Sequence, residues 1–499
     1  MLAGDSSGRG ANTPSGALYS GWLRDRAEAA APLPVSLAPA AIPSGTTGIV
    51  DNGTGAIPPS SQTATWSQAF GAAGNDAVGG ASHATSRGQS IAVDVEGNTI
   101  VAGWFTDSID LGDGPVASQG RSDIFLLKLD PSGKRLWSRV LGGEGADRAL
   151  GVAVNCDLEI VVTGWFMDDV DLGSGLVINA GGKDAFVTVF SADGEGLWSR
   201  GFGDEEDQLG NGVQVDGENN VVLTGAFGGT IDLGSGLLES AGGDDVFVAE
   251  LDSEGEPRWS KRLGGDGEQI GTAVAVDGGA NVIVTGTFEG RLDVGGAPVV
   301  SAGGKDVFVV KLDSLGDLAW LRRFGDGADQ SGLGVAVDSA GAAVVTGEFE
   351  GRMNFASGPL ESNGGKDIFV VKLDATSGHS LWGRAFGDAA NQSGSGVAVI
   401  GTGDIVLTGA FEGTCDFGRT ALVSKGRSDV FVAGLDRAGN HLWSERFGNA
   451  EAQFGGAVAV DESGAVVVTG GFFGSLDFGT GSLQCEGEQS AFVARLSPQ

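Results

Sequence analysis

A tryptophan that recurs seven times at nearly even spacing constrains the fold of this chain more than any other feature. The spacings between successive copies are 71, 61, 61, 61, 62 and 61 residues. Self-similarity at a fixed period is typical of propellers and solenoids, in which each repeat packs against its neighbours. The seven repeats begin near Trp66, Trp137, Trp198, Trp259, Trp320, Trp382 and Trp443.

Each repeat contains four short runs with the composition of β-strands. In the repeat that begins at Trp320, the runs are 320–325, 335–337, 343–346 and 368–373. They are β-branched or aromatic, and Gly, Asp, Asn and Ser bound them, as is usual for strands. Four strands in each of seven repeats predict an all-β fold, a seven-bladed β-propeller of four-stranded blades over residues 61–499. A linear β-solenoid is the alternative, although its repeats are usually shorter.

The order of these runs predicts how the ring closes. Residues 66–71 have the sequence of the outer strand of a blade, but they precede the first complete blade. The last run of the chain, 492–496, corresponds to a third strand. We therefore expect residues 66–71 to complete the seventh blade as its outer strand, which leaves no free sheet edge at the junction.

Two kinds of connection join the predicted strands. Short turns such as 130–133 and 338–341 lie on one face. The other face receives the loop from each outer strand to the next inner strand, such as 203–208, and a much longer loop that includes 232–234. Because rigid scaffolds carry function on their loops, we expect ligands to bind the face with the longer loops.

Outside the repeats, the sequence indicates little ordered structure. Residues 1–60 are rich in Ala, Gly, Pro, Ser and Thr, which predicts a disordered leader or linker. No stretch approaches the roughly 20 apolar residues of a membrane span, and no signal peptide is visible.

The three cysteines do not indicate a metal site. Cys156, Cys415 and Cys485 occupy different positions in the repeat and lack the spacing of a metal site.

The net charge of −35 restricts the partners of the chain. A field of this sign repels nucleic acid and anionic lipid and favours cations or basic partners, although solubility alone also explains it. We therefore expect no nucleic-acid partner, and we expect a monomer.

The repeat resembles a known family. The motif GVAVD-x-x-G-x-VVVTG, followed by DxFVxKLD-x-x-G-x-x-x-W, is similar to the bacterial seven-bladed β-propeller repeat family (SBBP repeats). The resemblance covers the seven repeats. Members of that family are typically surface or secreted proteins without assigned biochemistry, so the resemblance implies an extracellular or cell-surface location and supplies no catalytic residues.

A second resemblance concerns residues 374–382, which are similar to the tryptophan-docking motif of quinoprotein propellers. In that motif the tryptophan packs against the adjacent blade, which implies a structural role for the tryptophan series here. A quinoprotein usually has a vicinal cysteine pair, and this sequence has none.

Carboxylates also recur from repeat to repeat. Asp side chains suit turns because they bond to nearby backbone amides. Calcium bound by loop oxygens is the alternative, although the alternating D-x-D-x-D-G loop is missing. We therefore expect no cofactor, with calcium as the open alternative. The three series are Asp110, Asp171, Asp232, Asp293, Asp416 and Asp477; Asp123, Asp184, Asp245, Asp306, Asp367 and Asp429; and Asp94, Asp216, Asp277, Asp338 and Asp461.

The candidate binding residues lie on the face with the longer loops. Gln recurs there at matched positions, where it could line a polar ring at the channel mouth or tie neighbouring blades by amide hydrogen bonds. The first blade also carries an insertion within 72–88 that breaks the repeat. The candidates are His83, Arg87, Asp147, Asp207, Gln208, Gln269, Asp329, Gln330, Gln392 and Gln453, with no catalytic residue and no metal ligand.

These features predict a non-enzymatic, secreted or cell-surface scaffold that binds a protein or glycan partner through its loop face. Two alternatives stay open. One is a calcium-stabilised structural module, and the other is a quinoprotein-like or hydrolytic enzyme that uses the channel.

Overall fold

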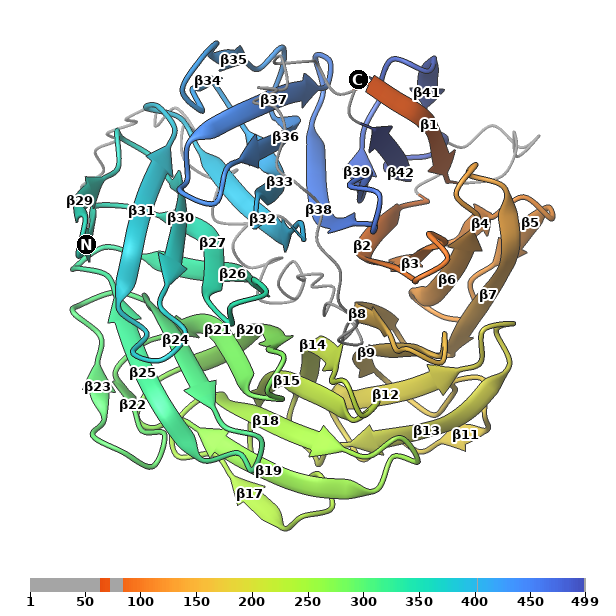
Figure 1. The fold of residues 1–499 in the computed structure, drawn as a ribbon. Coiled ribbons are helices and arrows are strands. Elements are labelled where there is room, and N and C mark those ends of the chain that lie inside the picture. Colours follow the sequence, from red (N-terminus) through yellow and green to blue (C-terminus); the bar gives the residue numbers. More distant parts are fainter. Residues whose placement is uncertain (1–62, 72–83, 402, 498–499) are drawn as a thin grey trace, which may run out of the picture. The chain divides into compact units, whose positions relative to one another are not determined.

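The computed structural model describes residues 63–71, 84–401 and 403–497. These residues form seven antiparallel blades around a central axis, as Figure 1 shows. The described part of the chain contains strands and no helix, so none there is long and apolar enough to cross a membrane. The predicted seven-bladed β-propeller is confirmed. The predicted leader over residues 1–60 lies outside the described residues.

Each blade has four main strands, numbered here from the axis outward. Blade 1 is β2 (Ser86–Val93), β3 (Thr99–Phe105), β6 (Asp123–Leu129) and β7 (Arg135–Gly143); blade 2 is β8 (Asp147–Val154), β9 (Ile160–Phe166), β12 (Asp184–Phe190) and β13 (Gly196–Phe202); blade 3 is β14 (Gln208–Val215), β15 (Val221–Phe227), β18 (Asp245–Leu251) and β19 (Pro257–Leu263); blade 4 is β20 (Gln269–Val276), β21 (Val282–Phe288), β24 (Asp306–Leu312) and β25 (Leu318–Phe324). Blade 5 is β26 (Gln330–Val337), β27 (Ala343–Phe349), β30 (Asp367–Leu373) and β31 (Ser380–Phe386); blade 6 is β32 (Gln392–Val399), β33 (Ile405–Phe411), β36 (Asp429–Leu435) and β37 (His441–Phe447); blade 7 is β38 (Gln453–Val460), β39 (Val466–Phe472), β42 (Ser490–Ser497) and β1 (Thr63–Phe70).

The core lies between neighbouring blades. The second and third strands of a blade are almost wholly buried, and β27 and β30 are buried along their whole length. They read as continuous apolar runs because another blade covers each of their faces. A phenylalanine pair recurs in this core: Phe288 and Phe308 meet edge to face with ring centroids 6.4 Å apart.

The ring closes as the sequence predicts. β1 pairs antiparallel with β42, with Trp66 opposite Arg495 and Phe70 opposite Ala491. Blade 7 therefore takes its outer strand from the N-terminal part of the chain, and β1 lies beside β42 in Figure 1. Because β1 covers the outer edge of β42, no third strand is left as an open sheet edge where the ring closes.

The long loops between second and third strands each contain a short hairpin, which the sequence analysis did not predict. Their strands have only two to four residues, too few to show alternation. A hairpin also contacts the outer strand of the preceding blade, where Val170 pairs with Gly143. The hairpin strands are β4 (Ser108–Asp110), β5 (Pro115–Ala117), β10 (Val170–Asp171), β11 (Leu176–Val177), β16 (Thr230–Asp232), β17 (Leu237–Glu239), β22 (Arg291–Leu292), β23 (Val299–Val300), β28 (Arg352–Phe355), β29 (Gly358–Glu361), β34 (Thr414–Cys415), β35 (Leu422–Val423), β40 (Ser475–Asp477) and β41 (Ser482–Gln484).

Six of the seven repeated tryptophans pack against a turn of the next blade. The Trp320 indole N–H donates to the Ala375 carbonyl, 3.2 Å away, in the turn before β31. A Cβ on Gly378 of that turn would lie 2.6 Å from the indole, and its φ of 64° also favours glycine. Trp259 differs, because its N–H donates to Glu250 within the same blade.

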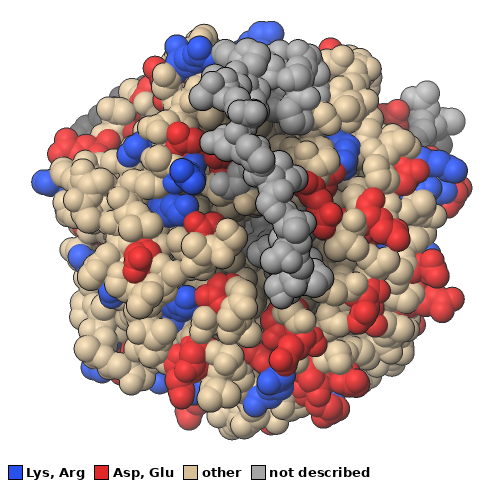
Figure 2. Space-filling model, viewed as in Figure 1, with Lys and Arg blue, Asp and Glu red and all other residues tan. Residues whose placement is uncertain are grey.

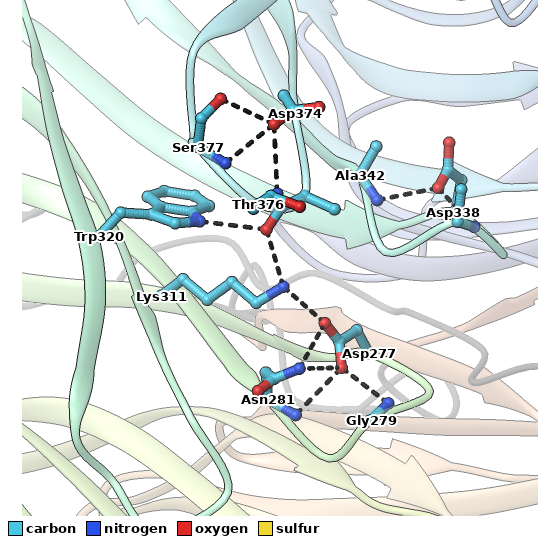
Figure 3. A network of polar contacts seen from close by, with 12 residues as sticks. Asp277, Gly279, Asn281, Lys311, Trp320, Asp338, Ala342, Asp374, Thr376 and Ser377 are labelled. Atoms are coloured by element: carbon cyan, nitrogen blue, oxygen red, sulfur yellow. Dashed lines mark hydrogen bonds and ion pairs between the residues drawn. The ribbon is translucent and has the colours of Figure 1, made fainter.

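On the face of the short turns, a lysine pairs with an aspartate of its own blade and also bonds to the next blade, as Figure 3 shows. Lys311 Nζ donates to Asp277 Oδ2 at 2.7 Å and to the Ala375 carbonyl of the next blade at 3.0 Å. Burial pulls the pKa of Asp277 upward. The hydrogen bonds from Lys311, Gly279 and Asn281 outweigh burial and hold that pKa below its usual value. Similar pairs are Lys128–Asp94, Lys372–Asp338 and Arg495–Asp461.

Candidate functional site

The chain direction defines two faces of the propeller. Each inner strand begins at the face that carries the hairpins and the outer-to-inner loops, which we call the loop face, and ends at the face of the short turns. The first residues of the seven inner strands therefore gather around the axis at the loop face (Figure 1). The sequence analysis placed its candidate binding residues on this face.

The repeated Gln residues begin inner strands, whereas the sequence analysis placed them in the preceding loops. The backbone of Gln330 pairs with Phe349 at the end of the second strand. Its side chain is buried: Nε2 donates to Asp326 Oδ1 at 3.0 Å and to the Glu350 carbonyl at 2.9 Å, and Oε1 accepts from the Asp326 amide.

The Gln330 side chain thus binds Asp326 in the loop that connects the preceding blade to its own. These bonds support the interpretation that the Gln residues tie neighbouring blades together. Gln208, Gln269, Gln392 and Gln453 are buried in the same way. Their binding role stays a prediction.

Two of the other candidates also contact loops. The exposed Asp207 accepts from Lys183 Nζ at 2.9 Å and from its amide at 3.0 Å. Asp329 accepts from the Lys305 amide at 3.0 Å. Each of these bonds links a long loop to the loop that enters the next blade. His83, the remaining candidate in the insertion, lies outside the described residues.

The repeated carboxylates of the loop face have structural roles. Asp232 accepts from the Gly234 amide at 2.8 Å, which is the predicted turn bond. Asp306 is buried, accepts from the Ala302 amide and pairs with Arg323 at 2.6 Å. Burial raises the pKa of Asp306 to about 6 in spite of these partners. Among the described residues, no group of three or more His, Cys, Asp or Glu side chains could hold a metal ion.

One position of the inner strands combines accessibility with variation. The second residue is partly exposed in every blade, whereas its neighbours in the strand are buried. The fourth residue also varies, but it is buried, and Asn211 and Thr272 donate there to carbonyls of the next blade. We call the seven second residues the mouth ring: Arg87, Arg148, Leu209, Ile270, Ser331, Ser393 and Phe454.

Blades 1 and 2 place aromatic residues beside the two arginines of the mouth ring. The Arg148 guanidinium lies 4.1 Å from the ring centroid of Trp104 and 5.4 Å from that of Trp165. Lys183 lies in the long loop of blade 2, and its Nζ is 5.4 Å from the Trp165 ring centroid. Cations over indole faces are attracted by the ring quadrupole. The predicted Arg87 pairs with Trp104 across β2 and β3, so its backbone lies in the same basic, aromatic sector of the ring.

The sequence analysis missed Trp104 and Trp165. Both stand at the sixth residue of a second strand, where blades 3 to 7 have Ala226, Thr287, Glu348, Ala410 and Gly471. They lie outside the sevenfold tryptophan series. A search for residues that depart from the repeat would have found them.

Asp147 is the one acidic residue that begins an inner strand. It stands where five other blades have Gln, and it is fully buried. Its carboxylate accepts from the Gly143 amide at 2.8 Å and from the Met167 amide at 3.3 Å. Burial raises the pKa of Asp147 to about 7, and the nearby Asp123 contributes to the shift. A titratable group therefore lies directly behind the basic sector.

Comparisons with known proteins come from sequence and from structure. No family model matches the chain. It is 21% identical over 496 residues to an uncharacterized WD repeat-containing protein of Acanthamoeba polyphaga mimivirus, covering 78% of this chain and 35% of that protein. It is 25% identical over 334 residues to the regulatory protein FlaEY of Caulobacter vibrioides, covering 61% of this chain and 34% of that protein. The chain spans about a third of the length of these curated relatives.

Solved propellers are similar to the chain at low identity. The β-propeller domain of the Trilobed protease from Pyrococcus furiosus is 8% identical and has a TM-score of 0.42, with 83% of this chain and 94% of that chain covered. The quinohemoprotein alcohol dehydrogenase from Comamonas testosteroni is 12% identical and has a TM-score of 0.40, with 83% and 76% covered. The strand pairings and the relatives together describe a seven-bladed β-propeller that is similar to a WD repeat-containing protein.

Proposed function

We propose that this propeller is a non-enzymatic binding module that recognises a partner through the mouth ring on its loop face. One observation carries the proposal: the partly exposed position of the inner strands changes from Arg to Leu, Ile, Ser and Phe around the ring, while the buried third and sixth positions are nearly constant. Folding requires the constant positions. Variation at an accessible position supports recognition, whereas the variable fourth position is buried and forms bonds to the next blade through Asn211 and Thr272.

The proposal includes a location and a family. The repeat motif supports membership of the SBBP repeat family and, with it, an extracellular or cell-surface location. Fractionation of cells that express the tagged full-length chain tests the location. Recovery in the cytoplasmic fraction alone would contradict that part of the proposal without affecting the binding site.

Site-specific photo-crosslinking tests the binding proposal. A photoreactive phenylalanine analogue replaces Ser331 of the mouth ring in the full-length chain, and Ser339, exposed in a short turn, serves as the matched control. Irradiation in the native cells and medium should give adducts from position 331 and none from position 339. Adducts from position 339 alone, or from neither position, would reject the mouth ring as the recognition surface.

A further inference from the structure

Two blades hold a lysine, an aspartate and an asparagine in contact with one another on the face of the short turns. We propose that in each of these blades the lysine amine reacts with the asparagine amide, which forms an isopeptide bond and releases ammonia. The bonds join Lys128 to Asn98 in blade 1 and Lys311 to Asn281 in blade 4. These modification sites lie on the face opposite the mouth ring, so the inference does not depend on the proposed function.

In blade 1 all three side chains are buried. Lys128 Nζ lies 3.0 Å from Asp94 Oδ2, and Asn98 Nδ2 donates to the same oxygen atom at 2.9 Å. The backbone amide of Asn98 also donates to Asp94 Oδ1 at 2.9 Å, which fixes the turn between β2 and β3. Because both nitrogens contact one oxygen, the amine and the amide are held beside each other. Reactants that are held in place avoid most of the entropic cost of a bimolecular reaction.

Blade 4 repeats this arrangement, and Figure 3 shows its three side chains pointing toward one another. Asp277 Oδ2 accepts from Lys311 Nζ at 2.7 Å and from Asn281 Nδ2 at 3.0 Å. Lys311 and Asp277 are buried, and Asn281 is half-buried. Asp277 and Asn281 belong to the turn after β20, whereas Lys311 belongs to β24. A bond between lysine and asparagine would therefore tie the third strand of the blade to the turn between its first two strands.

The aspartate can move the protons that this reaction requires. Lys128 Nζ gives one proton to Asp94 Oδ2, and the neutral amine attacks Cγ of Asn98. A second proton passes from Nζ through the carboxyl group to Nδ2. The Nζ–Cγ bond forms and the Cγ–Nδ2 bond breaks, ammonia leaves with three hydrogens, and Asp94 keeps one proton. No atom is oxidised or reduced, and the reaction needs no co-reactant.

Burial lowers the cost of the first proton transfer. Two charges are costly to bury, and one proton that moves from the lysine to the aspartate removes both of them. In blade 4 the hydrogen bonds hold the pKa of Asp277 below its usual value, so the charged pair is the resting form. The neutral pair is the reactive minor form, and the loss of ammonia makes its reaction irreversible.

Two other blades have the buried ion pair without the asparagine. Blade 5 pairs Lys372 with Asp338 at 2.8 Å, but Ala342 stands where blades 1 and 4 have asparagine. Blade 7 has Ala465 at that position, and its cation is Arg495. A guanidinium stays protonated in proteins and does not supply a neutral amine. The chain thus contains a blade that lacks one member of the set and a blade that lacks two.

Tandem mass spectrometry of a tryptic digest of the denatured full-length chain tests the inference. It should find two cross-linked peptide pairs, Asn98–Lys128 and Asn281–Lys311, each lighter than its two peptides by about 17 Da, the mass of the released ammonia. Asn220 should stay unmodified, because it contacts Asp216 in blade 3, where no lysine joins them. Linear, unmodified peptides at both sites would overturn the inference. A linear peptide with the same mass loss would mark a succinimide at the asparagine and would also overturn it.

Substitutions in two blades test the role of each group. Asn98→Ala should remove the cross-link of blade 1 and leave that of blade 4, since blade 5 accommodates alanine beside its ion pair. Ala342→Asn should create a third cross-link, to Lys372. Ala465→Asn is the matched control and should create none, because it places asparagine beside an arginine. A Lys128 cross-link that persists in Asn98→Ala, or an Ala342→Asn chain that folds without a third cross-link, would contradict the proposed reaction.

Discussion

A contact between neighbouring blades gives a sharp test of how the inner strands pack. Six blades have Gly at the third position of the inner strand, and the preceding blade has Thr at the fourth position of its second strand. A Cβ on Gly394 would lie 2.5 Å from Thr346 Oγ1. That hydroxyl cannot simply turn away, because it donates to the Phe369 carbonyl at 2.9 Å. The glycine therefore leaves room for the threonine.

The chain contains a natural exception that supports this reasoning. Blade 2 has Ala149 at the third position, and the matching residue of blade 1 is Ala102 rather than threonine. The methyl group of Ala149 occurs only where the hydroxyl is missing. The two positions therefore change together within one chain, as direct contact requires.

We predict that Gly394→Ala lowers the free energy of unfolding by about 1–3 kcal/mol, the usual cost of overpacking. Thr346→Ala alone should cost about 1–3 kcal/mol, because it leaves the Phe369 carbonyl without this buried donor. In the double variant the methyl group occupies the space of the hydroxyl. The double variant should therefore lose at least about 1 kcal/mol less than the sum of the two single losses.

Urea unfolding followed by tryptophan fluorescence measures these four proteins. The mirror experiment uses blade 2: Ala102→Thr should destabilise, and adding Ala149→Gly should restore most of the loss. Additive single losses, in either set, would refute the contact as the reason for the glycine.

Three further predictions concern packing and charge. Trp320→Ala should lower the free energy of unfolding by about 3–5 kcal/mol, measured by denaturation. It should leave binding at the mouth ring unchanged, measured by photo-crosslinking from position 331. An unchanged melting temperature would contradict the packing role of the tryptophan. Lys311→Ala should cost about 3–5 kcal/mol because it leaves Asp277 buried without its cation, whereas Lys311→Met with Asp277→Asn should cost less; equal losses would contradict this. Asp147 has a folded pKa of about 7, above its unfolded value, so its contribution to stability falls as the pH rises from about 4 to 7. Asp147→Asn should therefore flatten the decrease in stability between pH 5 and pH 8 by about 3 kcal/mol, because about two pH units of that window lie below the folded pKa, and an unchanged slope would show that another group titrates.

The repeat predicted the fold well because it reports what every blade needs. The tryptophan series, the closing strand and the turn role of residues such as Asp232 all follow from features that recur. The hairpins escaped prediction because their two to four residues show no period. Gln330 was placed in a loop because the predicted inner strand covered only residues 335–337, whereas the observed strand begins at Gln330.

The candidate site was harder to predict for the same reason. Arg87 was chosen because it adjoins an insertion, but Trp104 and Trp165 depart from the repeat and were passed over. Their proximity to Arg148 depends on two blades and three strands. Spacing along the sequence does not show such a contact, because the blades meet only after the ring has formed.

The closing strand also imposes an order in time. β1 is among the first parts of the propeller to be synthesised, and its partner β42 is the last. At about 5–20 residues per second, translation keeps them apart for about 20–80 s. During that interval β1 has no partner in its own chain, and a neighbouring nascent chain that presents β42 competes for it. The topology therefore favours one kind of misassembly, in which two chains exchange β1. A low concentration of nascent chains favours closure within one chain.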